Sequence, residues 1–136
     1  MSKQWSDFAW TSQTKLNFSP LWSHLTNERV IQMLAKTNPN KLTCVNLYHC
    51  LHITDHVIDY LIQERPYLSK LVLTLCDQIS PSALSRIGNF KKLASLDVSF
   101  CQTVTDEPLK SWANLQHLEH LFMSHCKSIT NEGIRS

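Results

Sequence analysis

The sequence predicts an α/β solenoid, a stack of short repeats that each contribute one strand and one helix. One phrase occurs four times, as VNLYHCLHITD, LVLTLCDQISP, LDVSFCQTVTD and LFMSHCKSITN, with its aligned cysteines 26, 25 and 25 positions apart. After each phrase the apolar spacing changes from two residues to three, which marks the change from strand to helix. A unit of this length cannot bury its own apolar face, so the units must stack.

The strands are predicted from pairs of apolar residues two positions apart. Such a pair puts both side chains on one face of a strand and the residue between them on the other face. Each unit therefore opens with a short strand. The pairs are Val45 with Leu47, Leu71 with Leu73, Leu96 with Val98, Leu121 with Met123 and, in an irregular first unit, Leu16 with Phe18.

The helices are predicted to begin at a Thr or Ser that follows each cysteine. A hydroxyl there can accept hydrogen bonds from the free N–H groups of the first helical turn, and the helix dipole favours a following Asp. Thr54-Asp55 and Thr105-Asp106 fit this pattern, and Ser80-Pro81 fits because proline is tolerated at the first helical position. The expected buried helix residues are Val30 and Met33, Ile58 and Leu61, Leu84 and Ile87, and Leu109 and Trp112.

The bulk composition is that of one ordinary globular domain. The 136 residues are 43% hydrophobic and carry a net charge of +2, so a core is feasible. The basic residues are scattered, which argues against a nucleic-acid partner. No apolar run approaches the about 18 residues of a membrane span, and MSKQWSDFAW lacks the apolar stretch of a secretory signal. The chain has only two glycines, so its turns must be made by other residues.

The repeated cysteines are predicted to form a buried structural ladder. A small apolar thiol suits the place where the chain leaves the strand and turns inward, whereas a catalytic thiol needs exposure and a lowered pKa. Their regular spacing favours a reducing compartment, although stacked strands about 4.8 Å apart would not by distance forbid a disulfide. We expect serine at Cys101 to cost about 1–3 kcal/mol, as a buried hydroxyl without a partner, and alanine less. The ladder residues are Cys50, Cys76, Cys101 and Cys126.

Metal and enzyme sites are not predicted. The sequence HCLHITDH offers His49, Cys50, His52 and His56, but His49 and Cys50 point to different sides and His56 lies on a helix. No CxxC pair completes a tetrahedral site, and no phosphate-binding loop, GxSxG or HExxH motif is present. The sequence therefore predicts neither a cofactor nor catalysis.

The repeat with its C..ITD signature resembles the cysteine-containing leucine-rich repeats of the F-box leucine-rich-repeat proteins. The resemblance runs from Leu16 to the end of the chain. It implies a right-handed β/α horseshoe arc of about five repeats, with a parallel sheet on the concave face and helices on the convex face. The implied function is the substrate-recognition arm of an SCF-type ubiquitin ligase, in the cytoplasm or nucleus. The alternative is a non-catalytic assembly scaffold, mitochondrial in location, because small mitochondrial assembly factors use similar units.

The start of the chain carries a second resemblance. SKQW, with Phe8-Ala9 and Leu16-Asn17-Phe18 beyond it, is similar to the junction between an F-box and its first repeat. The alternative is an unrelated cap in which Trp5, Phe8 and Trp10 cover the first apolar face. Most of an F-box would precede Ser2, so a Skp-type adaptor is expected as a partner only of a longer isoform. The expected divisions are a cap at 1–15 and repeats at 16–41, 42–67, 68–92, 93–117 and 118–136.

The last residues, ITNEGIRS, stop one turn into a helix and supply no polar cap for the final layer. We therefore expect a fragment or a short isoform of a longer protein.

The concave face is the expected binding surface, and a protein is the expected partner. Tyr48, Phe100 and Phe122 are its predicted anchors, because aromatic residues on a small, polar surface anchor protein partners. For Phe100 and Leu75 the alternative is packing against the strand edge. The predicted binding residues are Asn46, Tyr48, Lys70, Val72, Asp97, Phe100, His120 and Phe122.

Overall fold

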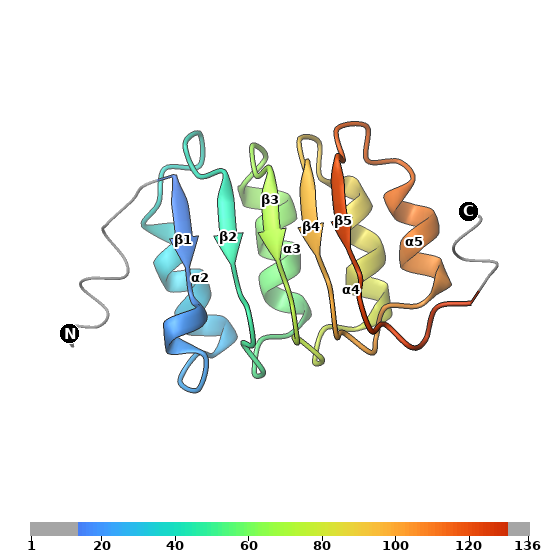
Figure 1. Ribbon diagram of the computed structural model, residues 1–136. Coiled ribbons are helices and arrows are strands. Elements are labelled where there is room, and N and C mark those ends of the chain that lie inside the picture. The colour runs from blue at the N-terminus through green and yellow to red at the C-terminus, as the bar shows by residue number, and fades with distance from the viewer. Residues whose placement is uncertain (1–13, 131–136) are drawn as a thin grey trace.

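The computed structural model describes residues 14–130, which form parallel strands alternating with helices (Figure 1). SKQW, Trp5, Phe8, Trp10 and the last six residues lie outside this range. Two single turns of 3₁₀ helix are η1 (Ser19–Leu21) and η2 (Ile87–Asn89). The strands are β1 (Lys15–Asn17), β2 (Cys44–Asn46), β3 (Lys70–Val72), β4 (Ser95–Asp97) and β5 (His120–Phe122), and the helices are α2 (Asn27–Ala35), α3 (Asp55–Glu64), α4 (Pro81–Arg86) and α5 (Asp106–Trp112).

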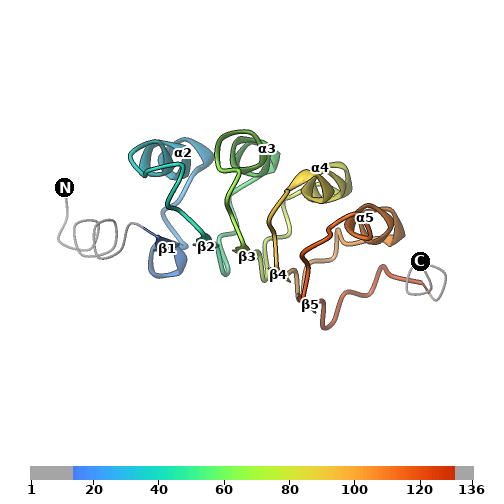
Figure 2. The same cartoon turned by 90° about the horizontal axis from the view of Figure 1, so that it is seen from above.

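The sheet follows the order of the chain. Its five strands are arranged β1-β2-β3-β4-β5, and every neighbouring pair is parallel. Seen from above, the strands line the inner side of a curved stack and the helices line the outer side (Figure 2). The predicted α/β repeat arc, with its sheet on the concave face, is confirmed.

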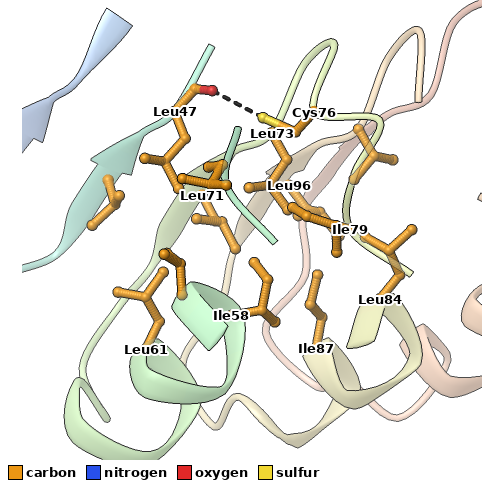
Figure 3. Packing of buried hydrophobic residues seen from close by; sticks show 14 of the residues in the cluster. Leu47, Ile58, Leu61, Leu71, Leu73, Cys76, Ile79, Leu84, Ile87 and Leu96 are labelled. Atoms are coloured by element: carbon orange, nitrogen blue, oxygen red, sulfur yellow. Dashed lines mark hydrogen bonds between the residues drawn. The ribbon is translucent and has the colours of Figure 1, made fainter. Parts of the chain in front are cut away.

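The core lies between the sheet and the helices. One row of aligned strand residues points inward, and each member packs on the equivalent residue of the next unit. Ile58 and Leu61 of α3 close the layer from the other side (Figure 3). The row consists of Leu16, Val45, Leu71, Leu96 and Leu121, of which all but Leu121 are buried.

The expected helix stripes are buried except in the first unit. There Val30 and Leu34 are buried, and Met33 is only partly covered. The buried pair is therefore four residues apart, which also lies on one face of a helix.

Most helix starts are tied to the next unit by a polar side chain. The carboxylate of Asp55 accepts hydrogen bonds from the backbone N–H of Ser80 at 2.8 Å and from its hydroxyl at 2.7 Å. Asn27 uses its amide in the same way, accepting from the N–H of Thr54 and donating to the Thr54 hydroxyl, both at 2.8 Å. These pairs join residues 25 and 27 positions apart, so they fix the spacing between neighbouring units.

A third pair repeats the pattern, and one joint departs from it. Asp106 accepts from the N–H of Thr130 at 2.9 Å and from its hydroxyl, and these hydrogen bonds hold the pKa of the Asp106 carboxyl below its usual value. Pro81 occupies the equivalent position of α4 and has no side-chain acceptor to offer Thr105. The joint between α4 and α5 therefore depends on other contacts.

The expectation that Thr54 and Thr105 cap their own helices is wrong. Neither side chain makes a capping hydrogen bond at its helix start. The hydroxyl of Thr54 instead accepts from Asn27 of the preceding unit. Thr26 and Ser80 do cap their helices, accepting from the N–H groups of the residues three positions on, at 3.3 and 3.1 Å.

Close helix packing holds the joint between α4 and α5. The indole N–H of Trp112 donates to the carbonyl of Leu84 at 2.8 Å, and the Ser111 hydroxyl donates to the carbonyl of Ser85. Gly88 lies against the same turn of α5, where a Cβ atom would come within 2.6 Å of the Ser111 backbone oxygen. The two helices can approach this closely because glycine has no side chain.

Arg65 is a buried cation that no sequence pattern predicts. Its side chain is 4% exposed and donates to the carbonyls of Leu34 and Glu64 and to the hydroxyl of Thr37. These acceptors lie at the ends of α2 and α3, where unpaired carbonyls and the helix dipole favour a positive charge. Arg65 thus stabilises the ends of two neighbouring helices at once.

We expect alanine at Gly88 to destabilise the protein by about 1–3 kcal/mol, because the new Cβ meets the Ser111 backbone and the helices must separate. At a site with free space the same change stabilises by about 0.4–1 kcal/mol, so the sign is diagnostic. Urea unfolding measures the difference. Asn89→Ala, at an exposed position of the same turn, is the control, and equal stability of the two variants would contradict the close packing.

We expect Asp55→Ala to cost about 1–3 kcal/mol of unfolding free energy, because the Ser80 N–H and hydroxyl lose their acceptor. Asp59→Ala is the matched control. It removes a carboxylate of the same helix that pairs with Arg86 at 2.7 Å on the exposed surface, and should cost less than about 1 kcal/mol. A larger loss for Asp59→Ala than for Asp55→Ala would refute the role of Asp55 in joining units.

Candidate protein-binding surface

The strand register sorts the concave face into rows that run across the sheet. Residues that open the strands align in a first row, and residues that close them align in a second row. The first row is Lys15, Cys44, Lys70, Ser95 and His120, and the second row is Asn17, Asn46, Val72, Asp97 and Phe122.

Beyond the strands the chain turns through a left-handed backbone conformation. His49, Leu75, Phe100 and His125 have φ angles of 61°, 67°, 64° and 60°. Such angles are uncommon for residues other than glycine. The turn places the following cysteine toward the core and leaves these four side chains, here called the turn row, at the far end of the concave face.

Aromatic and imidazole rings stack along the turn row. Phe100 and His125 have ring centroids 4.6 Å apart at an interplanar angle of 15°. At the other end of the row, Trp22 stacks on His49 at 4.5 Å and 21°. Phe100 still exposes 41% of its surface, whereas Leu75 is half-buried.

The three aromatic anchors expected from the sequence all have exposed side chains. Tyr48 exposes 46% and Phe122 51% of its surface, in addition to Phe100. Trp22, at 40% exposed, joins them and was missed. Its position after the first strand could have predicted its exposure, but the first unit is irregular, so Trp22 could not be aligned with His49 from the sequence.

The polar residues of the face serve partly to shape the turns. The Oδ1 atoms of Asn46 and Asp97 accept from the N–H groups of Tyr48 and Ser99, at 2.9 and 3.0 Å. Both side chains are half-buried, as is Val72, whereas Lys70 and His120 are exposed. Thr74 and Ser99, two positions beyond β3 and β4, occupy the place equivalent to Tyr48 but are almost covered.

The repeat cysteines join each unit to the preceding unit by thiol hydrogen bonds. The Cys76 thiol donates to the Leu47 carbonyl at 3.0 Å, and the Cys101 thiol donates to the Leu73 carbonyl at 2.9 Å. Cys126 does the same with Val98 at 3.2 Å, and Cys50 lies 3.9 Å from the carbonyl of Phe18. The expectation that Cys101 has no polar partner is therefore wrong.

Burial suppresses ionisation of these thiols. It raises the pKa of Cys50 and of Cys101 to about 12, and also raises the pKa values of Cys76 and Cys126. All five cysteines are free, and the fifth, Cys44, is half-buried on the first row. Burial raises the pKa of the Cys44 thiol as well, against the lowering effect of Lys70 and Lys15.

The histidines of HCLHITDH do not converge. His49 stacks on the surface, Cys50 is buried, and His52 and His56 are exposed. Within residues 14–130 no group of three or more His, Cys, Asp or Glu side chains could hold a metal ion. In the same range, no helix has the length and apolar character needed to cross a membrane.

Comparison with known proteins identifies the repeat. Residues 114–136 match the family model described as Leucine Rich repeat. A chain in the crystal structure of the Rad7 and Elc1 complex in yeast is similar, with a TM-score of 0.74 and 18% sequence identity. The match covers 93% of the present chain and 33% of that chain, so the present chain spans about a third of its length. None of the curated proteins matches. The fold is therefore a leucine-rich-repeat arc.

The thiol hydrogen bonds change the expected order of the Cys101 variants. A serine hydroxyl can donate to the Leu73 carbonyl, whereas alanine removes the donor and leaves a small void. We now expect Cys101→Ser to cost about 1 kcal/mol, and no more than Cys101→Ala. Thermal melts of both variants measure the order. Cys44→Ser, at a half-exposed position, should change stability by less than about 0.5 kcal/mol. A serine variant clearly less stable than the alanine variant would restore the original expectation.

Proposed function

We propose that this leucine-rich-repeat arc is a protein-interaction module whose concave face binds its partner. The observation that carries the proposal is the exposure of Trp22, Tyr48, Phe100 and Phe122 along that face. Large aromatic side chains supply most of the binding energy at many protein interfaces. An open sheet surface also favours a protein over a small molecule, since small ligands are held in concave pockets.

The finer role that we propose is that of a substrate-recognition arm of an SCF-type ubiquitin ligase, acting in the cytoplasm or nucleus. The C..ITD units support it by their resemblance to F-box leucine-rich-repeat proteins. The similar yeast structure is a complex of Rad7 with Elc1, which is consistent with such an arc working inside a larger assembly. Binding of a Skp-type adaptor belongs to a form of the protein that carries an F-box. In the alternative function, as an assembly scaffold, the chain would use the same binding face but have no role in ubiquitylation.

Tyr67 provides an internal comparison for the concave face. It exposes 48% of its surface, close to the values for Tyr48 and Phe122. It lies in the connection between α3 and β3 and belongs to none of the three rows. Removing its ring therefore measures nonspecific binding by an exposed aromatic side chain, and not binding by the concave face.

We expect Phe122→Ala and Tyr48→Ala to lose the partners that the wild-type chain captures from cell extract, because each removes an exposed anchor. A hot-spot ring contributes about 2 kcal/mol or more, which is at least about thirtyfold in affinity. Quantitative mass spectrometry of the captured proteins measures the loss. Thermal melts of both variants should match the wild type.

Tyr67→Ala is the control and should retain every partner. Equal losses in all three variants, or full recovery with the concave variants, would refute binding by the concave face. Capture of a Skp-type adaptor and a ubiquitylated partner by the F-box-bearing form would support the ligase role. A partner captured without either would support the scaffold.

A further inference from the structure

We propose that the partner segment bound by the concave face carries carboxylates along one side and apolar side chains along the other. This inference rests on the proposed function and specifies the chemistry of the partner. Its basis is the separation of two kinds of side chain, lysines at one end of the strands and rings at the other.

The basic end lies on the first three strands. Lys15 and Lys70 flank Cys44 in the register of the first row, so the two ammonium groups belong to strands on either side of β2. Both lysines are exposed, and within residues 14–130 neither forms an ion pair. Both charges lie close enough to the Cys44 thiol to oppose the rise in its pKa that burial causes. Two unpaired cations on one patch favour an anionic ligand.

The apolar end is formed by the turn row together with Trp22. His49 follows Cys44 by five positions and lies in the turn after β2, where the N–H of Cys50 donates to the carbonyl of Leu47 at 3.1 Å. Between the two ends, Thr74 and Ser99 are nearly covered, whereas the rings of Tyr48 and Phe122 are exposed. A ligand that lies across the strands therefore meets ammonium groups where the strands begin and exposed rings where they end and beyond.

The acidic residues of this face lie on or beside β4 and β5, whereas the lysines lie on β1 and β3. Asp97 is on β4, and its Oδ1 is already occupied by the N–H of Ser99. Glu119 is exposed just before β5. Carboxylates of the partner are consequently favoured over β1 to β3 and disfavoured over β4 and β5, where Phe100 and Phe122 offer apolar contact instead.

The length of the segment follows from the sheet. Four strand spacings of about 4.8 Å give about 19 Å from β1 to β5. An extended chain covers that distance in about six residues, and a helix in about thirteen. A displayed peptide of 16 residues is therefore long enough to test the inference in either conformation.

The test selects binders from a phage library of random 16-residue peptides on the immobilised wild-type chain. We expect enriched sequences that combine Asp or Glu with aromatic and aliphatic residues. Fluorescence anisotropy of the best synthetic peptide should show about tenfold weaker binding to Lys70→Glu, and weaker binding at higher salt. Bound peptide should also slow the reaction of Cys44 with a thiol reagent. Lys110→Glu, an equal charge change on the exposed side of α5, is the control and should bind as the wild type does.

Enriched neutral or basic peptides whose binding is lost with Phe122→Ala would overturn the acidic partner and leave the concave binding face intact. Acidic peptides that bind equally well to Lys70→Glu would overturn the assignment of Lys15 and Lys70. Failure to enrich any peptide would overturn binding of a short segment, while partner capture with the aromatic variants separately decides the proposed function. Thermal melts confirm that Lys70→Glu, a change at an exposed position, remains folded.

Discussion

Burial of one unit's apolar row by the next unit is the interaction on which the rest of the protein depends. A strand of three residues and a helix of two or three turns have too little surface to form a core alone. Stacking removes the leucine row from water on both sides, at roughly 25 cal/mol for each Å² of apolar surface. Because each layer needs the same spacing, every other contact is constrained to repeat at about the same interval.

The polar contacts are adapted to that interval. Asp55 and Asn27 reach the start of the next helix, and the thiols of Cys76 and Cys101 reach the carbonyl of the preceding turn. Both kinds of bond satisfy buried or half-buried backbone groups that a lone unit would leave to water. Where Pro81 interrupts the series of helix contacts, closer packing at Gly88 takes over.

Local patterns were sufficient to predict the strands, the helices and their parallel order, because spacing along the chain determines which face each residue occupies. The same patterns assigned Asp55 and Thr54 to their own helix, since the sequence does not show which residue of the neighbouring unit lies within reach. Arg65 escaped prediction for the same reason, as its acceptor Leu34 is 31 positions away. On the candidate surface, the exposed rings of Tyr48 and Phe122 followed from alternation along the strand. The burial of Thr74 depends on neighbouring units, so alternation along the strand could not predict it.

The left-handed turns have a consequence for how such a surface diverges. Glycine would adopt these φ angles at lower conformational cost, yet His49, Leu75, Phe100 and His125 occupy them, and the inward turn is completed by the cysteine that follows. Core packing therefore places few demands on the identity of the side chain in the turn. Ring, imidazole or aliphatic groups can be exchanged there while the leucine layers stay fixed, so the range of partners of a repeat protein can drift at nearly constant stability.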